Sequence, residues 1–269
     1  MIKMGIIGCG NMGGAMLRQM LKAGFFQPDE IMVADKNPQL LSQTAQELGI
    51  VATKDNRQAA QVPCLLLAVK PQFIRQITEE ISDCIPAGTL ILSIVMGYDL
   101  QMLAECVKHP QAPIVRIMPN TPVLVGEGVL AACRGKYVTD EQWAFAMKLL
   151  SCMGLAEEVP ENLMDAVTGV SGSSPAFAFL FLEALADAGV RGGLPRPLAQ
   201  RFAAQALLGS ARLALQTGLH PGPLKDMVTS PAGTTIEGVA ALEKDGFRYA
   251  VMDAVDAAIQ KSRSVKKKV

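Results

Sequence analysis

A glycine-rich turn near the start of the chain constrains its fold more than any other stretch. It reads Gly8-Cys9-Gly10-Asn11-Met12-Gly13, after the apolar run KMGII and at the start of the helical pattern NMGGAMLRQMLKAG. In this setting Gly8 permits a tight turn from strand to helix, Gly10 lets the backbone approach a pyrophosphate, and Gly13 allows close packing of helix on strand. The free N–H groups of the helix N-terminus attract anions to the same place. We therefore predict a dinucleotide site, with a purely structural turn as the alternative.

Short apolar runs alternate with amphipathic helical patterns as far as about residue 160. The runs are KMGIIG, EIMVAD, CLLLAV, TLILSIV and PIVRIM, followed by GEGVLAACRG and AEEVP as the last strands. Continuous apolar strands separated by helices are typical of a parallel sheet that is covered on both faces. The pattern predicts an α/β, Rossmann-type, doubly wound parallel sheet over residues 1–160, with the first strand beginning at Ile2.

From residue 161 to residue 269 the pattern is helical, with helices expected at 161–170, 175–190, 195–217, 235–244 and 246–264. The helix at 175–190 is apolar on nearly every side except at Glu183 and Asp187, so it needs cover on several sides. A small domain offers little cover, and we predict an all-α dimerisation domain whose helices pack against a partner subunit. The apolar stretch before Glu183 is expected to be too short to span a bilayer.

Composition excludes several other classes of protein. The 25 basic and 25 acidic residues cancel, which argues against a dedicated nucleic-acid binder. The six cysteines form no CxxC pair and are expected to be reduced, mostly buried thiols. With only two histidines, no metal site is predicted. An apolar strand at Ile2 leaves no room for a signal peptide, so we expect a cytoplasmic protein.

The end of the second apolar run bears on the choice of cofactor. It ends at Asp35, where a carboxylate usually bonds the ribose hydroxyls and repels a 2′-phosphate. Lys36 follows at once and could accept that phosphate instead. Asp35 could also be a helix cap before NPQLL. The cofactor is therefore predicted to be NADPH or NADH, with the choice between them left open.

Four further motifs complete a pattern that extends over essentially the whole chain. They are AVKPQ (68–72), MPNTP (118–122), VTGVSGSSPAF (167–177) and HPGPLKDMVTSPAGTT (220–235). Together with the glycine-rich turn, and in this order, they resemble the pyrroline-5-carboxylate reductase family. The resemblance implies reduction of L-1-pyrroline-5-carboxylate to L-proline by NAD(P)H, the last step of proline biosynthesis. It also implies a homodimer through the C-terminal helices, which some members assemble into a decamer.

Matching the motifs residue by residue implies a set of cofactor contacts. The set comprises Gly8, Cys9, Gly10, Asn11, Met12, Gly13, Asp35, Lys36, Asn56, Val69, Lys70 and Met96. Asn56 is expected at the adenosine ribose, and Met96, where relatives have alanine, beside the nicotinamide. Lys70 is interpreted as an orienting or structural residue, because imine reduction needs no amine nucleophile.

The resemblance also makes the stretch DMVTSPAGTTIEGV (226–239) a clamp for the substrate carboxylate. Backbone N–H groups of Met227, Thr234 and Thr235 are expected to hold the carboxylate, and the Thr235 hydroxyl is the expected catalytic donor to the imine nitrogen. From the residues alone, Thr234 and Glu237 form a capping box, which stays the alternative. Ala232 replaces a glycine of the relatives and is expected to need a negative φ.

Glu161 completes the predicted site, and two residues within the motifs, Ser174 and His220, are expected to have structural roles. Glu161 resembles an acid that approaches the substrate ring, with first-turn helix charge as an equal alternative. Ser174 is expected to be an N-cap with Pro175 at the first helical position. His220 is interpreted as structural.

Two other function classes stay open. A β-hydroxyacid dehydrogenase-like oxidoreductase shares a Rossmann domain followed by helices, but needs a catalytic lysine on a helix of the second domain. Lys225 is the only candidate before residue 240, and it is expected in a turn. The second class is a scaffold that binds dinucleotide or proline without turnover.

Overall fold

The chain, described here at residues 1–266 by a computed structural model, forms two compact units. One comprises Met1–Ser173 together with the chain from Ala258 onward, and the other comprises Ser174–Ala257. The first contains the sheet and the second contains only helices, which confirms the predicted fold class. The predicted domain boundary at residue 160 falls within the first unit.

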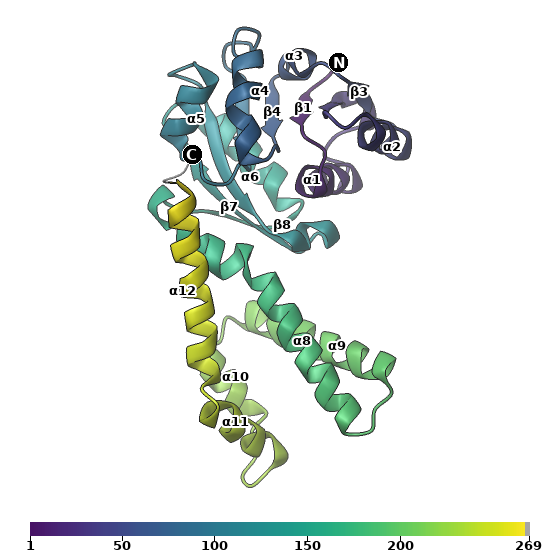
Figure 1. The fold of residues 1–269 in the computed structure, drawn as a ribbon, viewed down its shortest axis with the longest axis vertical. Helices are drawn as coiled ribbons and strands as arrows, with labels where there is room; N and C mark the ends of the chain where they lie inside the picture. The colour runs from purple at the N-terminus through teal and green to yellow at the C-terminus, as the bar shows by residue number, and fades with distance from the viewer. Residues whose placement is uncertain (267–269) are drawn as a thin grey trace. The chain divides into compact units, whose positions relative to one another are not determined.

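An eight-stranded sheet of order β3-β2-β1-β4-β5-β6-β7-β8 forms the first unit (Figure 1). Its strands are β1 (Met4–Ile7), β2 (Ile31–Ala34), β3 (Val51–Thr53), β4 (Cys64–Leu67), β5 (Leu90–Ser93), β6 (Ile114–Pro119), β7 (Gly128–Arg134) and β8 (Gly154–Glu158). Neighbouring strands are parallel except for β6 and β7. The strand order reverses at β1, so the carboxyl ends of β1 and β4 flank the point where open α/β sheets bind ligands.

Helices cover both faces of this sheet, as the continuous apolar strands predict. They are α1 (Asn11–Lys22), α2 (Pro38–Leu48), α3 (Asn56–Ala60), α4 (Ile74–Ile81), α5 (Leu100–Val107) and α6 (Asp140–Ser151). Successive residues of β1 enter different cores, because side chains alternate across a strand. Ile6 lies in a core with residues of α1, α2 and α6, whereas Ile7 lies in a core with residues of α3, α4 and α5.

Three details of the sheet differ from the prediction, and the first is the antiparallel pairing of β6 with β7. The first strand begins at Met4 rather than at Ile2. Strand β3 was not expected, because it has only three residues, Val51–Thr53, and these are exposed or half-buried. An edge strand of this length leaves almost no periodic signal in a sequence.

The helical stretch that leaves the sheet runs almost without a break from Glu161 to Arg191. It comprises a 3₁₀ turn (Glu161–Leu163), α7 (Met164–Val167), a π-helical turn (Thr168–Gly172) and α8 (Ser174–Arg191). The predicted N-cap at Ser174 is therefore wrong, since the residues before it are already helical. The stretch is also longer than predicted. With 31 residues and a mean hydropathy of 1.3, it is long and apolar enough to cross a membrane by length and composition. Only 11% of its most apolar 18 residues is buried. An apolar helix that a partner subunit covers passes the same test.

A side chain from the sheet compensates for the proline in this stretch. Pro175 has no N–H, so the carbonyl of Ser171, four residues earlier, lacks its α-helical donor. The Asn120 side chain donates from Nδ2 to that carbonyl at 3.0 Å, and its Oδ1 accepts the N–H of Val129 at 2.8 Å. Asn120, from the MPNTP motif, thereby ties the helix to the end of β6 and to β7.

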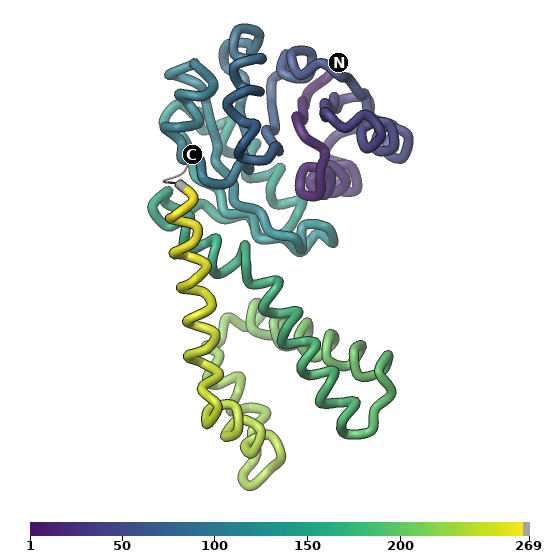
Figure 2. The backbone as a smooth tube through the Cα atoms, viewed as in Figure 1, coloured from purple at the N-terminus to yellow at the C-terminus, as the bar shows by residue number. Residues whose placement is uncertain are grey.

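The second unit consists of α8, α9 (Arg196–Thr217), α10 (Pro221–Met227), α11 (Thr234–Lys244) and the first part of α12 (Phe247–Lys266). α8 and α9 lie side by side (Figure 2) and bury Ala186, Ala199 and Ala203. No residue of α10 or α11 is buried, and Phe179 and Leu180 of α8 are 65% and 68% exposed. Apolar helices with so little cover are typical of a subunit interface.

Candidate functional site

The three glycines of the turn after β1 meet different structural needs. Gly8 has φ +100°, and a Cβ on it would lie 2.5 Å from the carbonyl oxygen of Ala68. A Cβ on Gly13 would lie 2.2 Å from the carbonyl oxygen of Gly8. Both are required by the fold itself.

Gly10 is different, because the fold alone does not require it. It is the N-cap of α1 with an extended backbone (φ −63°, ψ −166°), and nothing lies within 4 Å of a Cβ built on it. An open position at the N-terminus of the first helix fits a ligand that approaches the backbone, as a pyrophosphate does. Asn11 and Met12 are the first two residues of α1; Asn11 is exposed, whereas Met12 packs against the core that contains Ile6.

Asp35, at the end of β2, braces the glycine-rich turn. Its Oδ2 accepts the N–H of Cys9 and its Oδ1 accepts the N–H of Asn37, both at 2.8 Å. The possible capping role of Asp35 is not observed, because the N-cap of α2 is Asn37, whose side chain accepts N–H groups of the first turn. Lys36 points elsewhere, with Nζ 3.5 Å from the centroid of the Phe73 ring.

Cys9 takes part in this turn through its backbone. The residue is 3% exposed, and burial, followed by the charge of Asp35, raises the pKa of the Cys9 thiol to about 11. At neutral pH the group is a thiol, so it supplies no thiolate chemistry. All six cysteines are free, and Cys9, Cys64, Cys106 and Cys133 are buried, as predicted.

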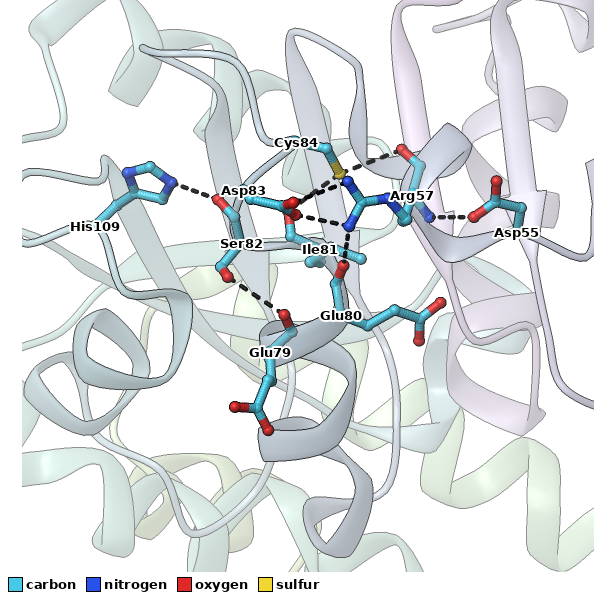
Figure 3. A network of polar contacts seen from close by, with 9 residues as sticks. All are labelled: Asp55, Arg57, Glu79, Glu80, Ile81, Ser82, Asp83, Cys84 and His109. Atoms are coloured by element: carbon cyan, nitrogen blue, oxygen red, sulfur yellow. Dashed lines mark hydrogen bonds and ion pairs between the residues drawn. The ribbon is translucent and has the colours of Figure 1, made fainter.

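Asn56 begins α3, and a polar network fixes the position of this short helix (Figure 3). Arg57 donates to both carboxylate oxygens of Asp83 at 2.7 and 3.0 Å and to the carbonyl of Glu80 at 2.8 Å. Asp55 accepts the N–H of Arg57 at 2.9 Å as the N-cap. Asn56 itself donates from Nδ2 to Glu80 Oε2 at 3.0 Å. The end of α4 therefore holds Asn56 in place.

The remaining predicted cofactor residues follow two central strands. Val69 and Lys70 come after β4; Val69 packs against the second core, whereas Lys70 is exposed. Met96 comes after β5 and is 46% exposed. The structure thus places the glycine-rich turn, Asp35, Lys36, Val69, Lys70 and Met96 after the carboxyl ends of β1, β2, β4 and β5. Asn56 instead lies in α3, bonded to Glu80 near the end of α4, and the individual roles of all these residues stay predictions.

Glu161 joins three parts of the first unit. Its Oε1 accepts the N–H of Leu100 at 2.8 Å and a bond from Nη1 of Arg116 at 3.0 Å. Leu100 is the first residue of α5, where an N–H has no partner within the helix. Sequence reasoning missed Arg116; the signal was a single charge within the apolar strand PIVRIM, since arginine is rarely buried without a partner. The predicted contact of Glu161 with substrate stays untested.

The predicted clamp lies in the second unit and differs from expectation in its cap. The N-cap of α11 is Gly233 and Thr234 is the first helical residue, so the capping box of Thr234 and Glu237 is wrong. Thr234 and Thr235 instead occupy the first turn, where N–H groups have no helical acceptor, and both are exposed. Met227 is the last residue of α10, a position whose N–H normally bonds within the helix. The two threonines are therefore the better placed donors for an anion.

Three more expectations about this segment are decided by the structure. Ala232 has φ +55°, so the expected negative φ is wrong, and a residue with a Cβ adopts the left-handed conformation here. Lys225 lies in α10 rather than in a turn, and it pairs with Asp226. His220 is structural, as predicted: its Nδ1 accepts the N–H of Gly222 at 3.1 Å and caps α10.

The chain is similar to known proteins over nearly its full length. The family model for pyrroline-5-carboxylate reductase dimerisation matches residues 161–265, and that for coenzyme F420-dependent NADP oxidoreductase matches residues 3–97. The pyrroline-5-carboxylate reductase of Escherichia coli K12 is 43% identical over 266 residues, covering 98% of each chain. That of Synechocystis sp. is 44% identical over 268 residues, covering 99% of each.

Solved structures agree. The Plasmodium falciparum pyrroline carboxylate reductase with NADP bound is 32% identical with a TM-score of 0.89, and the Coxiella burnetii pyrroline-5-carboxylate reductase is 31% identical with a TM-score of 0.91; each match covers 98% of both chains. A 3-hydroxyisobutyrate dehydrogenase of Mycobacterium tuberculosis, at 15% identity and a TM-score of 0.53, shares the fold alone. The chain therefore belongs to the pyrroline-5-carboxylate reductase family.

Proposed function

We propose that the chain reduces L-1-pyrroline-5-carboxylate to L-proline with NAD(P)H, the last step of proline biosynthesis. The observation that carries the proposal is the extent of the similarity, which covers 98% of both chains in the comparison with the Escherichia coli reductase. It therefore runs through the glycine-rich turn as well as through the segment 220–235. A protein related only through its Rossmann domain would lack the second of these.

The first unit binds and orients the cofactor, which supplies the hydride when bound. Gly10 leaves room for the pyrophosphate, and the N–H groups at the start of α1 point toward it. Asp35 holds the turn in shape through the N–H of Cys9. Val69, Lys70 and Met96 follow the strand ends nearest the switch point and flank the nicotinamide half.

The helical domain supplies the residues that hold the substrate. The N–H groups of Thr234 and Thr235 bind its carboxylate, helped by the partial positive charge of the α11 N-terminus. The Thr235 hydroxyl donates a hydrogen bond to the ring nitrogen, which gains its proton from solvent or through this hydroxyl. A protonated imine is already electrophilic, so positioning and charge complementarity account for most of the acceleration.

The same proposal includes the oligomeric state, the cellular compartment and the partners of the protein. Exposed apolar residues on α8 support a homodimer through the C-terminal helices. We extend this to the decamer formed by some members of the family. Six free cysteines favour a cytoplasmic enzyme. Neither nucleic acid nor a membrane is a partner.

The test is oxidation of the reduced cofactor with racemic pyrroline-5-carboxylate, run in parallel with NADH and NADPH, with L-proline measured as product. Rapid oxidation with matching formation of L-proline is expected. If both cofactors bind and neither is oxidised, the proposal is wrong, and the non-enzymatic scaffold and the β-hydroxyacid dehydrogenase-like oxidoreductase become the leading alternatives.

A further inference from the structure

Asp35 and Lys36, the two residues that follow β2, lie in different surroundings. Both oxygens of Asp35 already accept backbone N–H groups, from Cys9 and from Asn37. The carboxylate is therefore turned toward the glycine-rich turn and the start of α2. Each oxygen keeps a second lone pair, so Asp35 can still touch a ribose, and its charge still opposes a phosphate. Whether the site accepts a phosphate despite this charge depends on the neighbouring cation.

That cation, Lys36, is exposed, and within residues 1–266 it forms no ion pair. Its Nζ lies 3.5 Å from the centroid of the Phe73 ring. A cation over an aromatic face is attracted by the negative face of the ring. The ring therefore restricts a side chain that is otherwise among the most flexible in proteins.

The topology gives this pair its position. Phe73 ends the short helix Pro71–Phe73 that follows β4, and Lys36 follows β2. In the sheet, β2 and β4 are the two neighbours of β1. Lys36 and Phe73 therefore meet across the carboxyl end of β1, from which the glycine-rich turn starts. In a Rossmann-type sheet the adenosine ribose lies near the end of β2.

We propose that Lys36, held over Phe73, binds the 2′-phosphate of the cofactor and makes NADPH the preferred reductant, while Asp35 serves as a brace of the turn. The inference rests on the proposed function, because it assumes that this turn binds a nicotinamide dinucleotide. A phosphate monoester carries nearly two negative charges at neutral pH, and an ammonium with no carboxylate partner is a suitable ligand for it.

Binding of cofactor fragments tests the inference without turnover. Isothermal titration calorimetry on the full chain, at one fixed ionic strength, compares adenosine 2′,5′-bisphosphate with 5′-AMP. The bisphosphate should bind roughly ten- to a hundredfold more tightly, the usual contribution of a hydrogen bond to a charged group. Lys36→Gln should reduce that ratio to about one, and Phe73→Leu should reduce it by a smaller factor.

Lys54→Gln is the matched control. Lys54 is another exposed lysine at the same edge, directly after β3, and has no aromatic ring beneath it in the described residues. Its replacement should leave the ratio unchanged. Equal losses in Lys36→Gln and Lys54→Gln would mean that only the general field attracts the phosphate, and the inference would be overturned. A wild-type protein that binds 5′-AMP as tightly as the bisphosphate would overturn it too.

Asp35→Asn separates the brace from a ribose ligand. A brace predicts that both fragments lose affinity by the same factor, because the turn changes shape. A selective loss for 5′-AMP would make Asp35 a ribose ligand and refute the division of roles. Oxidation of NADH and NADPH at a ratio that Lys36→Gln does not change refutes this inference alone. Absence of oxidation with either refutes the proposed function itself.

Discussion

Replacing Glu161 with alanine removes one carboxylate oxygen that serves two donors. Oε1 accepts the N–H of Leu100 at 2.8 Å and a bond from Arg116 at 3.0 Å. The Arg116 side chain is only 10% exposed, so little water can replace the lost partner. The substitution therefore leaves a buried guanidinium and the first N–H of α5 without an acceptor.

The size of the effect follows from these two losses. A hydrogen bond between charged groups contributes about 1.5–3 kcal/mol, and the low end applies because the Glu161 side chain is 33% exposed. Loss of a cap at a helix N-terminus costs typically about 1 kcal/mol. We expect Glu161→Ala to lower the free energy of unfolding by about 2.5 kcal/mol, and Tm by roughly 5–10 °C.

Thermal and urea unfolding at one fixed protein concentration measure this loss, since association also contributes to stability. Glu157→Ala is a suitable control, because Glu157 is an exposed carboxylate on β8. A double-mutant cycle with Arg116→Met should give a coupling energy above about 1 kcal/mol. A Tm within 1 °C of the wild type, or additive effects in the cycle, would refute the reasoning.

The kinetics of Glu161→Gln separate positioning from contact with substrate. Glutamine keeps an acceptor oxygen for Leu100, so a residue that only positions α5 should leave the KM for the imine nearly unchanged. A rise in this KM without loss of stability would support the substrate contact that the family resemblance implies.

Four further predictions follow from single residues. Gly10→Ala should fold normally, because nothing lies within 4 Å of its Cβ, yet weaken cofactor binding at least tenfold; a lower Tm by differential scanning fluorimetry with unchanged affinity by calorimetry would contradict this. Ala232→Gly should raise the free energy of unfolding by about 1 kcal/mol, because φ there is +55°, and urea unfolding measures it; a loss would show that the methyl contributes more than the strain. Thr235→Ala should lower kcat more than it changes cofactor affinity, whereas Thr235→Ser keeps the hydroxyl and most of the rate; equal turnover of the alanine variant at saturating imine would remove Thr235 from the mechanism. Because the pKa of Cys9 is raised to about 11, the rate of its alkylation should rise roughly tenfold per unit of pH from pH 8 to pH 10. Mass spectrometry of the peptide that contains Cys9 measures this rate, and a rate that stops rising near pH 9 would indicate an ordinary thiol.

Much of the sheet could be predicted from the sequence because its central strands are buried on both faces. Ile6 and Ile7 are apolar alike although they enter different cores, and such runs are visible without any knowledge of tertiary structure. Strand β3 lacks this signal, since Val51 is 36% exposed and the strand pairs only with β2.

Errors in the second unit have a local cause. The segment HPGPLKDM contains two prolines and a glycine, which usually mark a turn, but Pro221 occupies the first turn of α10, where no N–H is needed. At α11 the threonines favoured a capping box, yet Gly233 takes the cap and shifts Thr234 into the helix.

Within the first unit, sequence could predict that the glycine-rich turn and the residues after the strands share one edge of the sheet, but not how they bond. The glycine-rich turn and the strand ends specify one edge of the sheet. That Asp35 turns both oxygens to backbone N–H groups, or that Arg116 meets Glu161, depends on side-chain directions that only the folded chain defines.

The carbonyl of Ser171 couples the residues that evolution can accept at two distant positions, 120 and 175. Pro175 cannot give it the α-helical N–H, and the Asn120 amide donates a hydrogen bond to it instead. A descendant that exchanges Pro175 for another residue regains an N–H for this carbonyl, and the hydrogen bond from Asn120 is then no longer needed. A descendant that loses Asn120 first gives up this hydrogen bond while Pro175 still offers no N–H. Over evolutionary time the two positions should therefore change together, with substitution of Pro175 preceding substitution of Asn120.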